Sequence, residues 1–262
     1  MIREKATASF PSLKDVPVFI SGGGSGIGAA LVDAFVAQRA RVAFCDIDET
    51  LGRQLCDRYA SDVRPWFAQC DVRDIPAYQA VLESCAKDFG PIRVLVNNAG
   101  RDDRHALQEL TPERWNDIVS VNLTHHVFAI QQVAPGMAAA GDGSIINMGS
   151  IAWLRGRPNL VGYTASKAAI SGLSRTLARE LGADGIRVNA ILPGAVLTER
   201  QKALWFNEDD AKKIVELQCL KFPVEVTDIA DMAVFLASSQ SRAVTGQSLL
   251  VDAGLAQVSV VG

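Results

Sequence analysis

The sequence lacks the features that mark membrane, secreted and nucleic-acid-binding proteins. None of its 262 residues belongs to a run of roughly 18 uninterrupted apolar residues, the length that a membrane-spanning helix needs. The first 15 residues contain no apolar stretch of the kind found in signal peptides. The formal net charge is −3 and no long basic run occurs, so neither nucleic acid nor a membrane surface is an expected partner. These absences favour a soluble, cytoplasmic protein.

Disulfide and metal-binding patterns are also missing. The five cysteines are an odd number without Cys-x-x-Cys or other metal-ligand spacing, so we expect reduced, mostly buried thiols. His125 and His126 stand together with no third ligand nearby, which favours a packing or subunit-contact role. We therefore predict no metal site.

What the sequence does contain is an alternation of short apolar runs and longer helical patterns. Short, almost wholly apolar runs are typical of strands buried on both faces of a parallel sheet. The helical patterns between them predict right-handed βαβ units. The candidate strands cover residues 16–20, 41–45, 66–69, 93–96, 144–148, 187–192 and 248–251, and the clearest helical patterns cover 27–38, 77–89, 160–181 and 228–237.

This alternation predicts an α/β fold, a single doubly wound Rossmann domain with a mostly parallel seven-stranded sheet and helices on both faces. No linker, low-complexity segment or longer repeat interrupts the pattern. We expect an N-terminal extension at residues 1–14 and one domain at residues 15–262.

A glycine-rich turn, residues 22–28, follows the first candidate strand and leads directly into a helix. Gly22, Gly26 and Gly28 alternate there with residues that include Ser25 and Ile27. Such glycines let the backbone approach a pyrophosphate, and the free N–H groups and positive dipole end of the helix then face the phosphates. The place of this glycine turn, between strand and helix, favours a dinucleotide site over an ordinary loop.

Asp46 closes the second candidate strand, 18 residues after Gly28. A carboxylate at this place can accept hydrogen bonds from both adenosine ribose hydroxyls and would repel a 2′-phosphate. Arg39 and Arg41 are less well aimed at such a phosphate. The sequence therefore favours NAD over NADP, with a capping or turn role for Asp46 as the alternative.

Seven signals in order make the chain resemble the short-chain dehydrogenase/reductase family from residue 16 to residue 254. They are the glycine turn, Cys70-Asp71-Val72, Asn97-Asn98-Ala99-Gly100, Asn122, Ser150, Tyr163-x-x-x-Lys167 and Pro193-Gly194. The resemblance implies one Rossmann dehydrogenase domain with a substrate lid at about residues 198–222. It also implies a homotetramer built on two long helices, near residues 112–139 and 161–182, and on the C-terminal strand.

The same resemblance implies which residues hold the coenzyme. Asp71 and Val72 would contact adenine. The residues expected to line the coenzyme cleft are Asn98, Ala99 and Gly100, and those expected around the nicotinamide are Pro193, Gly194, Val196 and Thr198.

Tyr163 and Lys167 lie four residues apart in a helical pattern, so they share one face of a helix. A free phenol has a pKa of about 10, and a neighbouring ammonium favours the phenolate and lowers that pKa. Tyr163 can then take the hydroxyl proton during oxidation or return it during reduction. The resemblance adds that Lys167 holds the nicotinamide ribose.

Ser150 lies 13 residues before Tyr163, where the family has its catalytic serine. Its hydroxyl would bond the substrate oxygen and stabilise the charge that develops there. Asn122 matches the fourth catalytic residue of the family, which helps to position a water in a proton relay. These residues together favour an enzyme over a protein that only senses NAD.

The substrate loop, residues 101–105, resembles a segment of bacterial aldose 1-dehydrogenases that act on xylose, galactose or related sugars. Asp102 and His105 can bind sugar hydroxyls, the indole of Trp153 can cover the apolar face of a pyranose, and Arg101 is a further candidate. We therefore predict NAD-dependent oxidation of an aldose at C1 to a lactone.

The same residues leave two substrate classes besides aldoses open. Arg101, Arg155 and Arg157 replace the Asn and apolar residues of the aldose enzymes, and their guanidinium groups could bind the carboxylate of a sugar acid or keto-deoxy sugar acid. A reductase of 3-oxoacyl-type ketones would use the same catalytic residues, but the polar substrate loop argues against a hydrophobic substrate. Residues 102–105 could also form a solvated turn, and Trp153 could serve only in packing.

Overall fold

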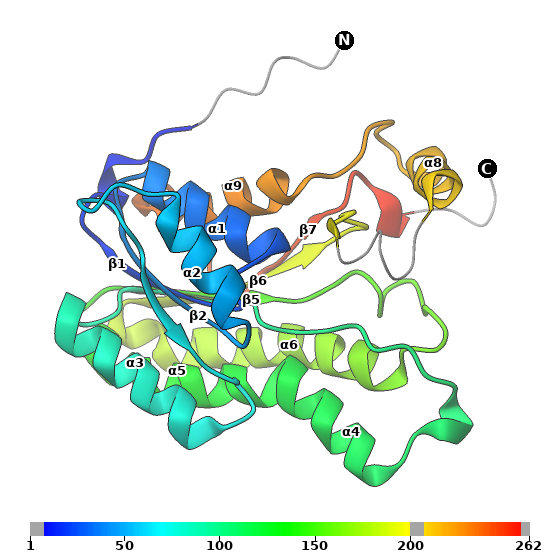
Figure 1. Ribbon diagram of the computed structural model, residues 1–262, viewed down its shortest axis with the longest axis horizontal. Helices are drawn as coiled ribbons and strands as arrows, with labels where there is room; N and C mark the ends of the chain where they lie inside the picture. The colour runs from blue at the N-terminus through cyan, green and yellow to red at the C-terminus, as the bar shows by residue number, and fades with distance from the viewer. Residues whose placement is uncertain (1–7, 200–206, 258–262) are drawn as a thin grey trace.

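The computed structural model describes residues 8–199 and 207–257. Its seven strands form one sheet in the order β3-β2-β1-β4-β5-β6-β7 (Figure 1). All neighbouring pairs are parallel, so the predicted doubly wound fold is confirmed and the described sheet is wholly rather than mostly parallel. The strands are β1 Pro17–Ser21, β2 Arg41–Asp46, β3 Trp66–Gln69, β4 Val94–Asn97, β5 Gly143–Met148, β6 Ile186–Pro193 and β7 Ser248–Val251.

Helices cover both faces of the sheet. Helices α1 and α9 lie on one face, and α3, α5 and α6 lie on the other (Figure 1). The helices are α1 Gly26–Ala37, α2 Glu49–Asp57, α3 Ile75–Phe89, α4 Pro112–Val119, α5 His125–Ala140, α6 Val161–Leu181, α8 Glu208–Leu217 and α9 Val226–Ala237. Within residues 8–199 and 207–257, no helix has the length and apolar character needed to cross a membrane.

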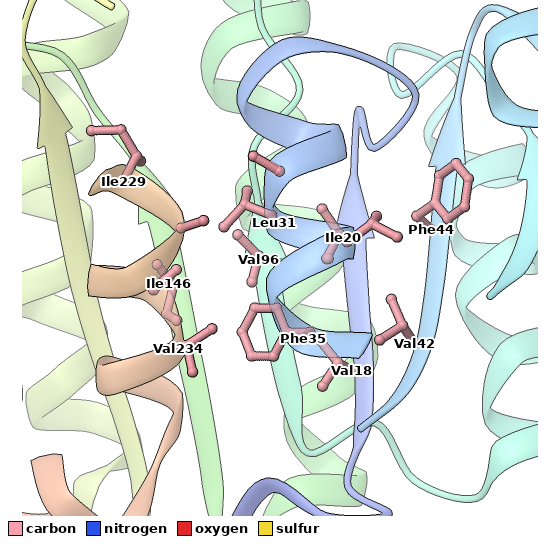
Figure 2. Close-up of a cluster of buried hydrophobic side chains, with 14 of the residues drawn as sticks. Val18, Ile20, Leu31, Phe35, Val42, Phe44, Val96, Ile146, Ile229 and Val234 are labelled. Carbon is pink, nitrogen blue, oxygen red and sulfur yellow. The ribbon is translucent and has the colours of Figure 1, made fainter. Parts of the chain in front are cut away.

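The five inner strands are mostly buried, as their apolar sequences predict, whereas the edge strands β3 and β7 are only partly buried. Val18 and Ile20 of β1 face α1 and α9, where they join Phe35 and Val234 in one cluster (Figure 2). Phe19, between them in the chain, packs in the cluster on the opposite face, because successive strand side chains alternate. Each such fully buried side chain stabilises the fold by roughly 1.5–3 kcal/mol.

Local sequence signals fix where several helices begin. The side chains of Asp48, Asp74 and Thr111 accept hydrogen bonds from the amides of the residues three positions later. Each of these residues therefore caps one helix, α2, α3 or α4, by satisfying an amide that has no partner within the helix.

The described part of the N-terminal segment lies on the domain. Leu13 is buried in the same cluster as β1 and α1. Gln38, at the end of α1, accepts a hydrogen bond from the amide of Phe10 and donates one to the carbonyl of Ala8. Leu13 and Phe10 of the predicted extension thus pack on the core, while residues 1–7 lie outside the described chain.

The structure also decides the roles left open for cysteine and histidine. Four thiols are buried and Cys219 is exposed, as expected for reduced, mostly packed cysteines. His125 and His126 have no exposed surface, so they pack inside this chain and the alternative of a subunit contact is wrong. His125 bonds the carbonyl oxygen of Ala99 and His126 bonds the side chain of Asn147.

Candidate active site

The motif residues gather at the carboxyl edge of the sheet. β1 pairs with both β2 and β4, so the connections leave it in opposite directions and a crevice opens between the β1 and β4 ends. The residues that follow or close these strands are Gly22 after β1, Asp46 at the end of β2, Asn98 after β4, Ser150 after β5 and Gly194 after β6.

The glycine turn is packed too closely for side chains. A Cβ at Gly28 would lie 1.8 Å from the carbonyl oxygen of Gly22. Gly22 itself has a φ of +66° and lies against Ala99, whose Cα would be 2.9 Å from an added Cβ. The side-chain amide of Asn98 donates hydrogen bonds of 2.8 and 3.1 Å to the backbone carbonyls of Gly22 and Ser21. The turn and the loop that follows β4 (the β4 loop, residues 98–106) therefore form one continuous wall of the site.

The start of α1 has the features of an anion site. Ser25 is the N-cap in an extended conformation, and its hydroxyl makes no capping hydrogen bond. Gly26 has a φ of +54°, and the methyl group of Thr198 would lie 3.3 Å from a Cβ at that position. The first amides of α1, including those of Ile27 and Gly28, can thus receive a diphosphate, which fits a dinucleotide.

Asp46 lies directly beside the glycine turn. Its carboxylate accepts hydrogen bonds from the amides of Gly24, at 2.8 Å, and Asp48, at 3.0 Å. A Cβ at Gly24 would lie 2.9 Å from the same carboxylate. The carboxylate therefore lies at the end of β2 and against the glycine turn, the position from which the sequence predicts a contact with the adenosine ribose.

Ser21 is a functional position that sequence reasoning missed. Its hydroxyl accepts hydrogen bonds from the backbone N–H groups of Asn98 and Ala99, at 3.0 and 3.1 Å. It therefore ties the β4 loop to the glycine turn. A serine at a strand end carries no signal of this role, because the partners lie 77 and 78 residues away.

Lys167 lies buried between the β5 end and Tyr163. Its Nζ donates a 2.8 Å hydrogen bond to the carbonyl of Met148 and lies 5.8 Å from the centre of the Tyr163 ring. Burial lowers the pKa of Lys167 to about 7. A phenolate at Tyr163 would supply a countercharge to this buried ammonium, so each ion would favour the other.

Asn122 lies in a π-helical turn, Ser120–Thr124, between α4 and α5. The expected helix near residues 112–139 is therefore two helices joined by a π turn, a feature often found at functional sites. The side-chain amide of Asn122 accepts a 3.0 Å hydrogen bond from the backbone N–H of Arg101. It donates hydrogen bonds to the carbonyls of Arg101, at 3.0 Å, and Ile118, at 2.9 Å. A Cβ at Gly100 would lie 2.9 Å from Asn122 Oδ1 and 3.2 Å from Lys167 Nζ, so both side chains flank Gly100.

Ser150 is half-buried, two residues after Met148, whose carbonyl holds Lys167. Its hydroxyl oxygen accepts a 3.1 Å hydrogen bond from the amide of Ala152. This bond uses the oxygen as an acceptor, so the hydroxyl proton can still point to a substrate oxygen.

The substrate loop is anchored on both sides, unlike a solvated turn. The Arg101 guanidinium pairs with the carboxylates of Asp103 and Asp117. His105 is buried, and its amide donates a 2.9 Å hydrogen bond to the carbonyl of Asn159. The loop therefore lies fixed between α4 and residues 151–159.

Trp153 belongs to a small apolar cluster with Leu192, Leu255 and Ile214 of α8. Trp153 and Ile214 thus pack on the same cluster, which lies beside both the loop that follows Ser150 and α8, within the predicted lid. Residues 200–206 of the predicted lid lie outside the described chain. Trp153 Nε1 and His105 Nε2 are buried and have no hydrogen-bond partner within the described residues.

The remaining predicted coenzyme residues lie along the same edge. Asp71 and Val72 follow β3, and Val72 is buried. Pro193 ends β6, and a Cβ at Gly194 would lie 2.6 Å from the Cα of Asp252. Val196 is buried beyond them. Among the described residues, no group of three His, Cys, Asp or Glu side chains could hold a metal ion.

Comparison with known proteins agrees with this geometry. A family model described as Enoyl-(Acyl carrier protein) reductase matches residues 22–256. A Rhizobium meliloti protein named "Probable galactose dehydrogenase GalD" is 47% identical over 95% of this chain and 98% of its own length. The chain belongs to the short-chain dehydrogenase/reductase family. It is therefore an oxidoreductase that uses a nicotinamide coenzyme.

Two further relatives show the range of this family. The D-xylose 1-dehydrogenase of Caulobacter vibrioides is 43% identical over 95% of this chain and 99% of its own length. The crystal structure of a 3-oxoacyl-[acyl-carrier protein] reductase with bound NAD from Brucella melitensis covers 98% of both chains, with 32% identity and a TM-score of 0.86. The fold is thus shared by enzymes of very different substrates, and the substrate side of the cleft has to distinguish them.

Proposed function

We propose that this protein oxidises an aldose at C1 to the lactone, with NAD as the hydride acceptor. The observation that carries the proposal is the buried Lys167 amine beside Tyr163, in a cleft where the carboxylate of Asp46 lies against the glycine turn. The two sugar dehydrogenases among its relatives support the substrate class.

The chain holds the coenzyme through contacts spread along the sheet edge. The amides at the start of α1 bind the diphosphate, Asp46 accepts hydrogen bonds from the adenosine ribose, and Asp71 and Val72 meet the adenine. Lys167 donates a hydrogen bond to the nicotinamide ribose. When bound, the nicotinamide supplies the hydride chemistry, and the protein supplies orientation and electrostatics.

Proton transfer depends on Tyr163. As a phenolate, its oxygen removes the proton from the C1 hydroxyl while the C1 hydrogen leaves as hydride. The ammonium of Lys167 stabilises that phenolate, and the Ser150 hydroxyl donates a hydrogen bond to the sugar oxygen. Asn122 fixes the proton-relay side of the cleft through its two hydrogen bonds with the backbone of Arg101.

The substrate loop favours an uncharged sugar over a sugar acid. Arg101 is already paired with two carboxylates, so it offers no uncompensated charge to a substrate carboxylate. Asp102 can accept hydrogen bonds from sugar hydroxyls, whereas His105 Nε2 and Trp153 Nε1 are buried and do not reach the surface of the cleft. This arrangement supports an aldose.

A substrate panel tests the proposal. Purified protein is mixed with NAD or NADP and with an aldose, a sugar acid or a secondary alcohol, and the rise in NAD(P)H absorbance is followed. The reverse reaction is tested by mixing the protein with NADH and a 3-oxoacyl thioester and following the loss of NADH absorbance. We expect the highest kcat/KM for a pentose or hexose aldose with NAD. Faster turnover of a sugar acid or of the 3-oxoacyl thioester would replace the aldose assignment.

We further propose a cytoplasmic homotetramer. An apolar hollow of about 770 Å³ lies beside α9 and β7 and is lined by Met232, Phe235 and Leu250, among others. A second copy that pairs its own β7 and α9 would cover this hollow, and the long α5 and α6 helices would supply the other interface. Light scattering after size exclusion tests this assembly, and a monomer at micromolar concentration would contradict it.

A further inference from the structure

A chain of ion pairs joins the adenine end of the coenzyme site to the substrate loop. Three carboxylates alternate with two guanidinium groups in this ion-pair chain, which runs Asp71, Arg73, Asp117, Arg101 and Asp103. Its members come from three segments: the β3 end, α4 and the β4 loop. Only the pairs at the two ends of the ion-pair chain join near neighbours in the sequence, and both central pairs join separate segments.

At the adenine end, Arg73 grips Asp71 from two sides. Arg73 Nε lies 3.0 Å from each carboxylate oxygen of Asp71, and another guanidinium nitrogen lies 2.6 Å from Oδ2. The backbone amide of Arg73 adds a 3.0 Å bond to Oδ1. Arg73 therefore fixes the carboxylate that we expect to meet the adenine.

Asp117 is the central link. One carboxylate oxygen accepts a 2.6 Å hydrogen bond from Arg73, and the other accepts one from Arg101. Burial disfavours the charge on Asp117, but the two guanidinium groups outweigh it and lower its pKa. Arg73 likewise holds the pKa of Asp71 below its ordinary value. Both carboxylates thus stay ionised through the neutral range.

At the substrate end, Arg101 is held by its backbone and by its side chain. Asn122 bonds its N–H and C=O, while its guanidinium reaches both Asp117 and Asp103. Asp103 adjoins Asp102, the candidate sugar ligand. The side chains of the ion-pair chain are only 32–36% exposed, so solvent screens them less than the open pairs on the surface.

We propose that Asp117 is a positioning residue that couples adenine binding at Asp71 to sugar binding at the substrate loop, through Arg73 and Arg101. This inference rests on the proposed function. Occupation of the adenine site restrains Asp71 and Arg73, and Asp117 passes that restraint to Arg101. The anchored substrate loop then loses its remaining freedom of movement before the sugar arrives, so each ligand raises the affinity for the other by the same factor.

The test measures this coupling factor directly. NADH affinity of the full-length protein is followed by NADH fluorescence, with and without a saturating concentration of the aldose that it oxidises fastest. NADH with aldose forms a complex that cannot react, so binding is read without turnover. We expect the aldose to tighten NADH binding of the wild type at least about fivefold, the lower end of typical couplings. In Asp117→Asn this factor should fall to below about twofold.

Two variants separate coupling from general damage. Asp142→Asn removes an ion pair with Arg93 at the amino ends of β4 and β5, the opposite edge of the sheet, and should leave the coupling factor unchanged. Asp117→Glu keeps the charge and should restore part of the factor. A loss of melting temperature without a change in coupling would show that Asp117 is merely structural.

The outcomes distinguish failure of the proposed function from failure of the coupling. A wild type that binds no NADH, or oxidises no aldose, refutes the proposed function and the inference together. A wild type that does both, with a coupling factor of one or a factor that Asp117→Asn leaves intact, refutes the inference alone.

Discussion

The two halves of the cleft are built in different ways. The coenzyme half consists of short segments at the ends of successive strands, such as the glycine turn with Asp46, which the pairing of the parallel strands brings together. The substrate half consists of the β4 loop, residues 151–159 and α8: a hydrogen bond joins His105 to Asn159, and Trp153 and Ile214 of α8 pack on one apolar cluster. A site on the ends of paired strands is fixed by the sheet, whereas one made of cross-linked loops can change its ligand when any anchor changes.

The largest effect should come from the residue that both halves share. Tyr163→Phe removes the proton acceptor and leaves the ring in place, so kcat should fall by about a thousandfold, within the usual range for a general base. NADH affinity should stay within threefold of the wild type, because the phenol oxygen is lost but Lys167 remains. Tyr59→Phe, at an exposed pair with Asp33, is the matched control. Retention of a tenth of the activity would show that another group takes the proton.

The next effect is confined to the coenzyme half. Asp46→Ala removes a carboxylate that we expect to accept charged hydrogen bonds from the ribose, each worth about 1.5–3 kcal/mol. The ratio of kcat/KM for NAD to that for NADP should therefore fall by about 30-fold, while the KM for the aldose changes little. Asp48→Asn, which alters the cap of α2 beside it, should leave the ratio unchanged. An unaltered ratio in Asp46→Ala would remove the ribose contact from the proposal.

A smaller effect should be confined to the substrate half. Asp102→Asn weakens a candidate acceptor of sugar hydroxyls, so the KM for the aldose should rise about tenfold, as expected for the loss of one charged hydrogen bond. The KM for NAD should change less than twofold. Glu109→Gln, in the exposed turn that follows the substrate loop, provides the control. An equal rise in both KM values would mean that the two halves are not separable at this position.

The smallest effect at neutral pH concerns the core behind the cleft. Burial lowers the pKa of His125 to about 3 and that of His126 well below its ordinary value. Below about pH 6.5 these imidazoles are protonated in the unfolded chain but stay neutral in the folded chain. The free energy of unfolding therefore decreases as the pH is lowered, by up to about 1.4 kcal/mol per pH unit for each imidazole.

Denaturant unfolding at pH 7 and pH 5 measures that slope. His125→Gln should reduce the loss of stability between the two pH values, because one of the two buried imidazoles is gone. Arg242→Gln, at an exposed position after α9, should leave the slope unchanged. An identical slope in His125→Gln would show that this imidazole is protonated in the folded chain.

The fold and the coenzyme half could be predicted from the sequence to a large extent. All seven strands lie within two residues of the ranges that the apolar runs predict, because the inner strands of a parallel sheet are covered on both faces and are therefore mostly apolar. Gly28 could be assigned to a close backbone approach because no other residue fits there. The helix near residues 112–139 was predicted as one piece, because the π turn around Asn122 leaves the apolar pattern nearly intact.

The sequence by itself thus determined the order of strands and helices, the glycine turn and the spacing of Tyr163 and Lys167, since each depends on residues close together in the chain. Only the tertiary structure decided that Arg101 pairs with Asp117, that Ser21 holds the β4 loop and that Trp153 and α8 pack on one apolar cluster. The first contact joins residues 16 positions apart, and the second joins residues 77 positions apart. No local pattern specifies such pairs, because the packing of the whole sheet and its helices brings them together.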